Sequence, residues 1–173
     1  MTEIINKILA LATVLADIFL ILAILYFWFT KGTDKIKSFF EKNGLLLAWL
    51  VALSSTILSL YYSEIVGFPP CSLCWWQRIF IYPQAIILGM AYFKKDFKIV
   101  SYDLALSVVG AVIAFYQNYI YYGGTQFLAC DSSPTAISCT KLYIFEFGYV
   151  TIPVMSLTAF LLMILFLKLQ KKA

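Results

Sequence analysis

The sequence contains no histidine. This absence excludes histidine-ligated zinc and haem sites, and it excludes catalytic pairs in which histidine activates a serine or a cysteine. Charge is also scarce, because only 13% of the 173 residues are charged, whereas soluble domains carry about 25%. So few charges exclude a soluble domain, a disordered chain and a nucleic-acid binder that works through a basic patch.

Long hydrophobic runs are abundant instead: 62% of the residues are hydrophobic and the mean hydropathy is +0.88. Apolar runs of about 17–25 residues predict membrane-spanning helices. Five are predicted, at Ile8–Phe29, Leu45–Tyr62, Trp75–Phe93, Leu104–Tyr122 and Tyr149–Leu169. The first is longer than a signal-peptide core, so we expect it to remain in the protein. The sequence therefore predicts an all-α integral membrane protein.

The basic residues are distributed unequally between the two sides of these spans. Ten of the 13 fall in connectors on one side: Lys31, Lys35, Lys37, Lys42, Lys94, Lys95, Lys98, Lys168, Lys171 and Lys172. Lys7 and Lys141 fall on the other side, and Arg78 lies just inside a span. Because positive residues stay in the cytoplasm, we expect a multi-pass protein with its N-terminus outside and its C-terminus in the cytoplasm.

The four cysteines form two pairs on this map. Cys71 and Cys74 lie at the entry to the third span, and Cys130 and Cys139 lie in the connector between the fourth and fifth. Two spans separate the pairs, so both are expected on the non-cytoplasmic face. Disulfides persist in that oxidising compartment.

The first pair has the pattern of a reactive dithiol. Two prolines, Pro69 and Pro70, precede it and predict a helix start, with proline in the first turn. A thiolate at a helix N-terminus is stabilised by unpaired N–H groups and the helix dipole. Arg78 follows Cys74 by four residues, on the same helical face, and would place a positive charge near that thiolate.

Three other interpretations of these residues stay open. Arg78 could be an interfacial anchor, and the four cysteines could form a Cys₄ zinc site. The cysteines could also form two inert structural disulfides. A Cys-x-x-Cys disulfide closes a very small loop and so stabilises the fold little, which favours redox work.

The second pair lies in a polar segment that contains Pro134. Such a loop is suited to presenting a disulfide to another protein and then to the first pair. Tyr143–Phe147, after the loop, is interpreted as an interfacial anchor. The chain carries no flavin, dinucleotide, haem or iron–sulfur signature, so the natural electron acceptor is a quinone dissolved in the membrane. Aromatic and amide side chains that could line its pocket, if they do not simply pack between helices, are Trp75, Trp76, Tyr82, Tyr116 and Gln117.

The segment from Cys71 to Arg78 (CSLCWWQR), followed by Tyr82-Pro83, resembles the signature of the disulfide bond formation protein B (DsbB) family. It is most similar to the shorter BdbC-type branch. Phe147–Pro153 resembles the start of that family's last helix. The resemblance extends from about Leu45 to the C-terminus.

The resemblance implies a four-helix bundle at residues 45–173, with residues 1–44 adding a transmembrane helix and a basic cytoplasmic connector. It implies a disulfide oxidoreductase of the bacterial cytoplasmic membrane that reduces ubiquinone or menaquinone. The implied partner is a DsbA-like thiol oxidase with a thioredoxin fold. No metal and no nucleic acid is expected.

The resemblance also implies roles for individual residues. Cys74 would be the thiolate nearest the quinone, with Cys71 as its partner. Arg78 would contact the quinone, and we expect Trp75 and Gln117 beside it. In the loop, the mixed disulfide with the partner protein would form at Cys130, and Cys139 would exchange with Cys71.

The chain departs from the family pattern at three points. It has the additional first span, its loop between Cys130 and Cys139 is short, and Gln117 stands where many relatives carry a histidine. Glutamine can donate a hydrogen bond to a quinone but cannot titrate. The alternatives at this point are a quinone reductase of the vitamin K epoxide reductase type and a non-enzymatic scaffold with structural disulfides.

Overall fold

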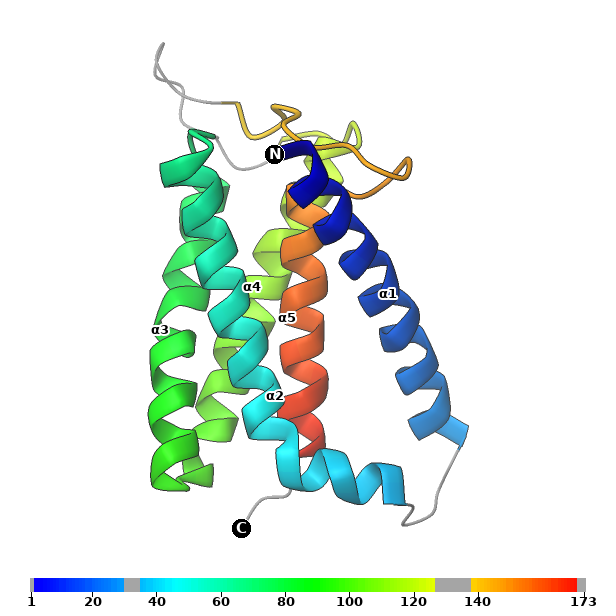
Figure 1. Cartoon of the computed structure of the whole chain (residues 1–173), viewed down its shortest axis with the longest axis vertical. Helices are drawn as coiled ribbons and strands as arrows, with labels where there is room; N and C mark the ends of the chain where they lie inside the picture. The colour runs from blue at the N-terminus through cyan, green and yellow to red at the C-terminus, as the bar shows by residue number, and fades with distance from the viewer. Residues whose placement is uncertain (1, 30–34, 127–137, 171–173) are drawn as a thin grey trace.

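The computed structural model describes residues 2–29, 35–126 and 138–170. Within them lie five long helices: α1 (Thr2–Phe29), α2 (Lys35–Leu60), α3 (Ser72–Lys94), α4 (Val100–Tyr121) and α5 (Ile152–Leu169). The helices run side by side and alternate in direction, so the start of α1, the start of α3 and the segment before α5 share one end of the molecule (Figure 1). The predicted all-α membrane architecture is confirmed.

Helix α2 begins well before the expected Leu45. Its first turns, from Lys35, lie across the lower end of the bundle before the helix turns to run upward (Figure 1). Phe40 in this part stacks on Phe166 of α5, with ring centroids 5.9 Å apart. The basic connector predicted here is therefore partly a helix, because its aromatic residues pack against the bundle.

Helices α2 to α5 form the core of the bundle. Small residues let these helices approach closely, as is usual between helices in membranes. Ala48, Ala52 and Ala114 are fully buried. At Gly110 of α4, an added Cβ would lie 2.3 Å from the ring of Phe160 of α5. Glycine is required there because the ring occupies the space of a side chain.

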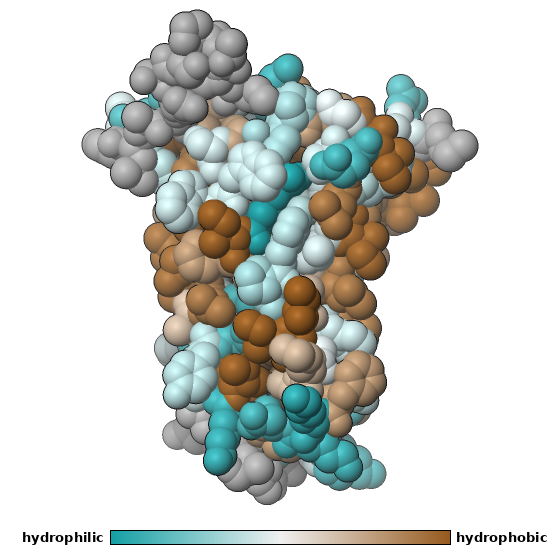
Figure 2. All heavy atoms as spheres, turned by 90° about the vertical axis from the view of Figure 1, so that its left-hand side faces the viewer, coloured by the Kyte–Doolittle hydropathy of each residue, from teal (hydrophilic) through white to brown (hydrophobic). Residues whose placement is uncertain are grey.

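Within the described residues, four stretches are long and apolar enough to span a membrane: Thr2–Phe29, Lys35–Ile65, Phe97–Tyr121 and Ile152–Leu169. Helix α3 is more polar, yet it packs between α2 and α4 and runs alongside them (Figure 1). Its polar residues Gln77, Arg78 and Gln84 are buried, so its outer face remains apolar. On the side of the bundle that carries α3, hydrophilic residues gather at the lower end, and hydrophobic patches lie among paler residues in the middle (Figure 2).

Helix α1 lies at the edge of the bundle and packs against α5. Its one mid-span carboxylate, Asp17, would be costly in the bilayer unless it faced another helix. Asp17 accepts hydrogen bonds from the hydroxyl of Thr158 in α5 (2.7 Å) and from the hydroxyl of Tyr149 (3.0 Å). The carboxylate thus joins α1 to the last helix.

Candidate active site

Cys71 is the N-cap residue of α3. Its backbone is extended, and its Sγ accepts a hydrogen bond from the backbone N–H of Cys74 at 3.4 Å. The sequence predicted proline in the first helical turn. Pro69 and Pro70 instead precede the cap, because the helix begins at Ser72. The predicted position of the pair at a helix N-terminus is confirmed.

The two sulfurs of this pair are in direct contact. The Sγ atoms of Cys71 and Cys74 lie 2.8 Å apart as thiols, with Cys71 buried and Cys74 partly buried. The hydrogen bond to Cys74 and burial raise the pKa of the Cys71 thiol. Cys71 therefore holds its proton and donates it toward Cys74, which is the sulfur placed to carry negative charge.

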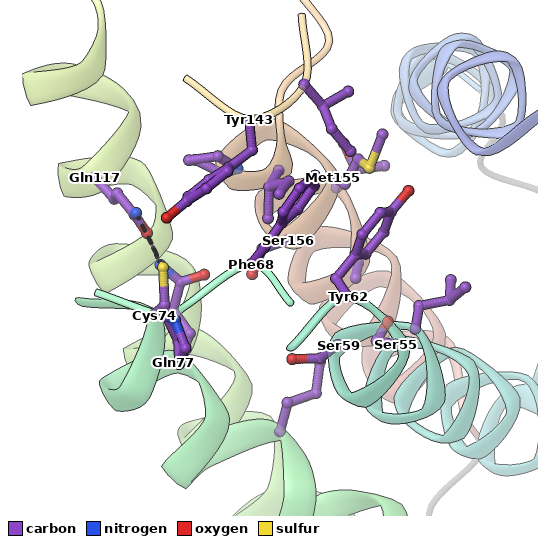
Figure 3. Close-up of a pocket in the computed structure, with 18 of the residues that line it drawn as sticks. Ser55, Ser59, Tyr62, Phe68, Cys74, Gln77, Gln117, Tyr143, Met155 and Ser156 are labelled. Carbon is purple, nitrogen blue, oxygen red and sulfur yellow. Dashed lines mark hydrogen bonds between the residues drawn. The ribbon is translucent and has the colours of Figure 1, made fainter. Parts of the chain in front are cut away.

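Gln117 of α4 connects both sulfurs to the bundle. Its Nε2 lies 3.4 Å from Cys71 Sγ and 3.4 Å from Cys74 Sγ, and its Oε1 accepts a hydrogen bond from Gln77 Nε2 (2.5 Å). The bond from Gln77 determines which end of the Gln117 amide faces the cysteines (Figure 3). Gln117 thus offers N–H donors to a thiolate on Cys74.

Arg78 is buried and points into the bundle. Its Nε donates to Ser59 Oγ (3.0 Å) and its Nη2 donates to the Ser59 carbonyl (3.1 Å). The hydroxyl of Tyr82 donates to the same Ser59 Oγ (3.2 Å). The guanidinium also lies 5.2 Å from the centroid of the Trp75 ring. These partners on α2 and α3 hold a permanent positive charge inside the bundle, one helical turn from Cys74. The side chain of an interfacial anchor would instead face the lipid.

Cys139 lies against the first turn of α3. Its Sγ is 3.5 Å from Ser72 Oγ, and it packs in one buried cluster with Cys71, Leu73 and Ile120. Cys139 is disulfide-bonded and only 2% exposed, whereas the sequence suggested a loop that presents both of its cysteines. Cys130 lies outside the described residues, so its role stays a prediction. The structure brings the other three cysteines together.

A cavity of about 320 Å³ opens beside this site. Cys74, Gln77, Arg78, Gln117 and Cys139 contribute to its walls, together with residues of α1, α2 and α5 (Figure 3). The remaining lining is largely aliphatic side chains and small hydroxyl residues. The cavity therefore combines an apolar interior with a dithiol and a cation at one end.

The aromatic residues proposed from sequence are not the ones that line this cavity. Trp75 is 54% exposed, lies outside the lining and contacts Arg78. Trp76 is equally exposed, and neither Tyr82 nor Tyr116 belongs to the lining. Tyr82 instead contacts Ser59 and Arg78 from outside the lining, and Tyr116 packs against the buried cluster that contains Cys71.

A stack of three other aromatic rings covers the cavity instead. Tyr62 stacks on Phe68 (centroids 5.8 Å apart), and Phe68 stacks on Tyr143 (4.6 Å). The Tyr143 hydroxyl donates to the Pro69 carbonyl at 3.2 Å. Tyr143, interpreted from sequence as an interfacial anchor, also lines the cavity. No local pattern marks this stack, because its members come from three separate segments.

Residues 41–170 match the family model described as disulfide bond formation protein DsbB. The chain is 42% identical to "probable disulfide formation protein C 1" of Bacillus anthracis over 121 residues, which cover 70% of this chain and 86% of that protein. It is 40% identical to "disulfide bond formation protein C" of Bacillus subtilis (strain 168) over 127 residues, covering 73% and 91%. No solved structure gives a significant match.

Proposed function

Because this chain belongs to the DsbB family of disulfide bond formation proteins, we propose that it is a thiol–quinone oxidoreductase. Its relatives support a disulfide oxidoreductase role in a multi-pass bacterial membrane protein. In the proposed reaction it reoxidises a DsbA-like thioredoxin-fold oxidase outside the cytoplasm. The electrons then pass to ubiquinone or menaquinone.

One observation carries the proposal: the Cys71–Cys74 dithiol opens into an apolar cavity that also contains the guanidinium of Arg78. A quinone ring is flat and apolar, with carbonyl oxygens that accept hydrogen bonds and gain negative charge on reduction. Cationic and N–H donors placed where charge develops stabilise such a change. Arg78 and Gln117 supply both kinds of donor next to the sulfurs.

Electrons would enter through the loop pair. A thiolate of the reduced partner attacks Cys130 of a Cys130–Cys139 disulfide, which forms a mixed disulfide and releases the Cys139 thiolate. The partner's second thiolate then resolves the mixed disulfide, so the partner leaves oxidised and Cys130 is released. Each exchange replaces one S–S bond by another.

Transfer to the first pair uses the contact between Cys139 and the start of α3. The Cys139 thiolate attacks Cys71 of an oxidised Cys71–Cys74 pair and releases Cys74 as a thiolate beside Gln117. Cys130 then attacks Cys139, which restores the loop disulfide and releases Cys71. A bound quinone would accept two electrons and two protons as the Cys71–Cys74 disulfide re-forms.

The test combines the purified full chain, a reduced thioredoxin-fold dithiol protein and a quinone, with quinone absorbance as the readout. We expect quinone reduction by the wild type and none by Cys74→Ser. Met90→Leu is the control, because Met90 lies on the exposed face of the same helix. Absence of reduction by the wild type, or unchanged reduction by Cys74→Ser, contradicts the proposal.

A further inference from the structure

Helix α1 precedes the region matched by the family, which begins at residue 41. It nevertheless forms part of the cavity beside the cysteines. Four of its residues line the cavity: Leu9, Ala12, Thr13 and Ala16. The role of this helix therefore extends beyond membrane insertion.

The cavity-facing side of α1 is built from small side chains. Ala12, Thr13 and Ala16 recur at the spacing of one helical face. The Thr13 hydroxyl donates to the Leu9 carbonyl of its own helix (2.8 Å), so it is already satisfied. Leu15 is large, exposed and outside the cavity lining. Small residues on the inner face leave open the space between α1 and the bundle.

Polar contacts hold α1 at both ends of this face. The Tyr62 hydroxyl, at the end of α2, donates to Asn6 Oδ1 at 2.7 Å. Further along α1, Asp17 accepts the hydrogen bonds of Thr158 and Tyr149. Hydrogen bonds between helices in membranes contribute about 0.6–2 kcal/mol each. These contacts fix which face of α1 turns toward the cavity.

Two hydroxyl groups on the other walls are available to a ligand. Ser55 of α2 and Ser156 of α5 line the cavity (Figure 3). Neither has a hydrogen-bond partner among the described residues. A hydroxyl within a membrane bundle ordinarily finds a partner, so this pair points to a ligand with hydrogen-bond acceptors in an otherwise apolar space.

We infer that α1 is a wall of the quinone-binding cavity, and that the quinone lies between it and the Ser55 and Ser156 hydroxyls. This inference rests on the proposed function. In this arrangement α1 covers the groove between α2 and α5, and it limits the size of the ligand that the groove can hold. The helix thus acts on quinone binding and not on thiol exchange, which involves Cys139 against the first turn of α3.

The test enlarges the inner face of α1. Ala12→Phe and Ala16→Phe insert a ring into the cavity, while Leu15→Phe places the same ring on the outer face of the same helix. We expect the KM for quinone to rise about tenfold in the two inner variants, which corresponds to about 1.4 kcal/mol of binding, and to stay unchanged in Leu15→Phe. A single-turnover exchange with the reduced partner, without quinone, should be unchanged in all three.

Direct labelling separates this inference from the proposed function. A photoreactive quinone analogue should label residues of α1 in the wild type and label them less in Ala16→Phe, whether or not the protein turns over. Thermal melting without quinone checks that each variant is folded. Unchanged KM in both folded inner variants, or labelling that spares α1 in a protein that reduces quinone, overturns the inference.

Discussion

The side-chain amide of Gln117 donates to the sulfur of Cys74 across 3.4 Å, from α4 to the first turn of α3. The same amide reaches Cys71, and Gln77 holds it in place. Gln117 thus acts as a fixed N–H donor to the dithiol. The amide itself cannot titrate.

The first prediction concerns this amide. Gln117→Leu removes the donor to both sulfurs and leaves the buried Gln77 amide without its partner. The loss of a hydrogen bond to a charged group costs about 1.5–3 kcal/mol, so we expect quinone reduction to slow at least tenfold. Steady-state quinone absorbance measures the rate, and ultraviolet thiolate absorbance measures how readily Cys74 ionises.

Gln117→His provides the matched comparison. Histidine titrates within the physiological pH range, so this variant should add a titration between about pH 5 and pH 8 to the pH dependence that the cysteine thiols already give the wild type. Wild-type activity in Gln117→Leu, or identical pH profiles for Gln117→His and the wild type, would contradict a direct role for the amide.

The second prediction concerns Arg78. Its Nε and Nη2 donate to two atoms of Ser59, and its flat guanidinium lies over Trp75. A lysine keeps the charge but cannot reproduce the planar fork. Arg78→Lys should therefore raise the KM for quinone several-fold, while single-turnover thiol exchange is retained. An unchanged apparent affinity for quinone would refute this role.

The third prediction concerns transfer between the two cysteine pairs. Ser72 Oγ lies 3.5 Å from Cys139 Sγ and can donate to the thiolate that forms when the loop disulfide opens. Ser72→Ala should slow reduction of the first pair by about twofold to tenfold, the equivalent of a hydrogen bond of about 0.5–1.5 kcal/mol. Acid quenching and alkylation during a single turnover measure this step.

Ser72→Thr is the control for that measurement, because it keeps the hydroxyl. It should retain most of the transfer rate, and the KM for quinone should be the same in both variants. Equal transfer rates in Ser72→Ala and the wild type would show that the contact has no kinetic role.

The fourth prediction concerns orientation in the membrane. Single cysteines at Lys98→Cys and Lys141→Cys, in a cysteine-free background, occupy exposed positions in the connectors after α3 and before α5. The distribution of positive residues places the first in the cytoplasm and the second outside. An impermeant maleimide added to intact cells should label only the second. The opposite pattern would reverse the predicted topology.

The sequence by itself determined the class of protein, the helices and the place of the Cys71–Cys74 pair at a helix start. Helix positions follow from the length of apolar runs, which the bilayer thickness sets, and the structure differs mainly where Phe40 extends α2 over the end of the bundle. Local spacing was enough to predict that Cys71 lies at the start of α3 and that Arg78 lies one turn below Cys74. The family signature depends on the same segment.

Only the tertiary structure decided which residues surround the dithiol. Three features depend on how each helix is rotated about its axis and how deeply it lies in the bundle. These are the bond of Arg78 to Ser59, the bond of Gln77 to Gln117, and the turn of the small face of α1 toward the cavity. Membrane helices are apolar all round, so periodicity scarcely indicates which face turns inward. Their rotation is set by close packing and by a few interhelical hydrogen bonds, such as those of Asp17, and these join residues far apart in the chain.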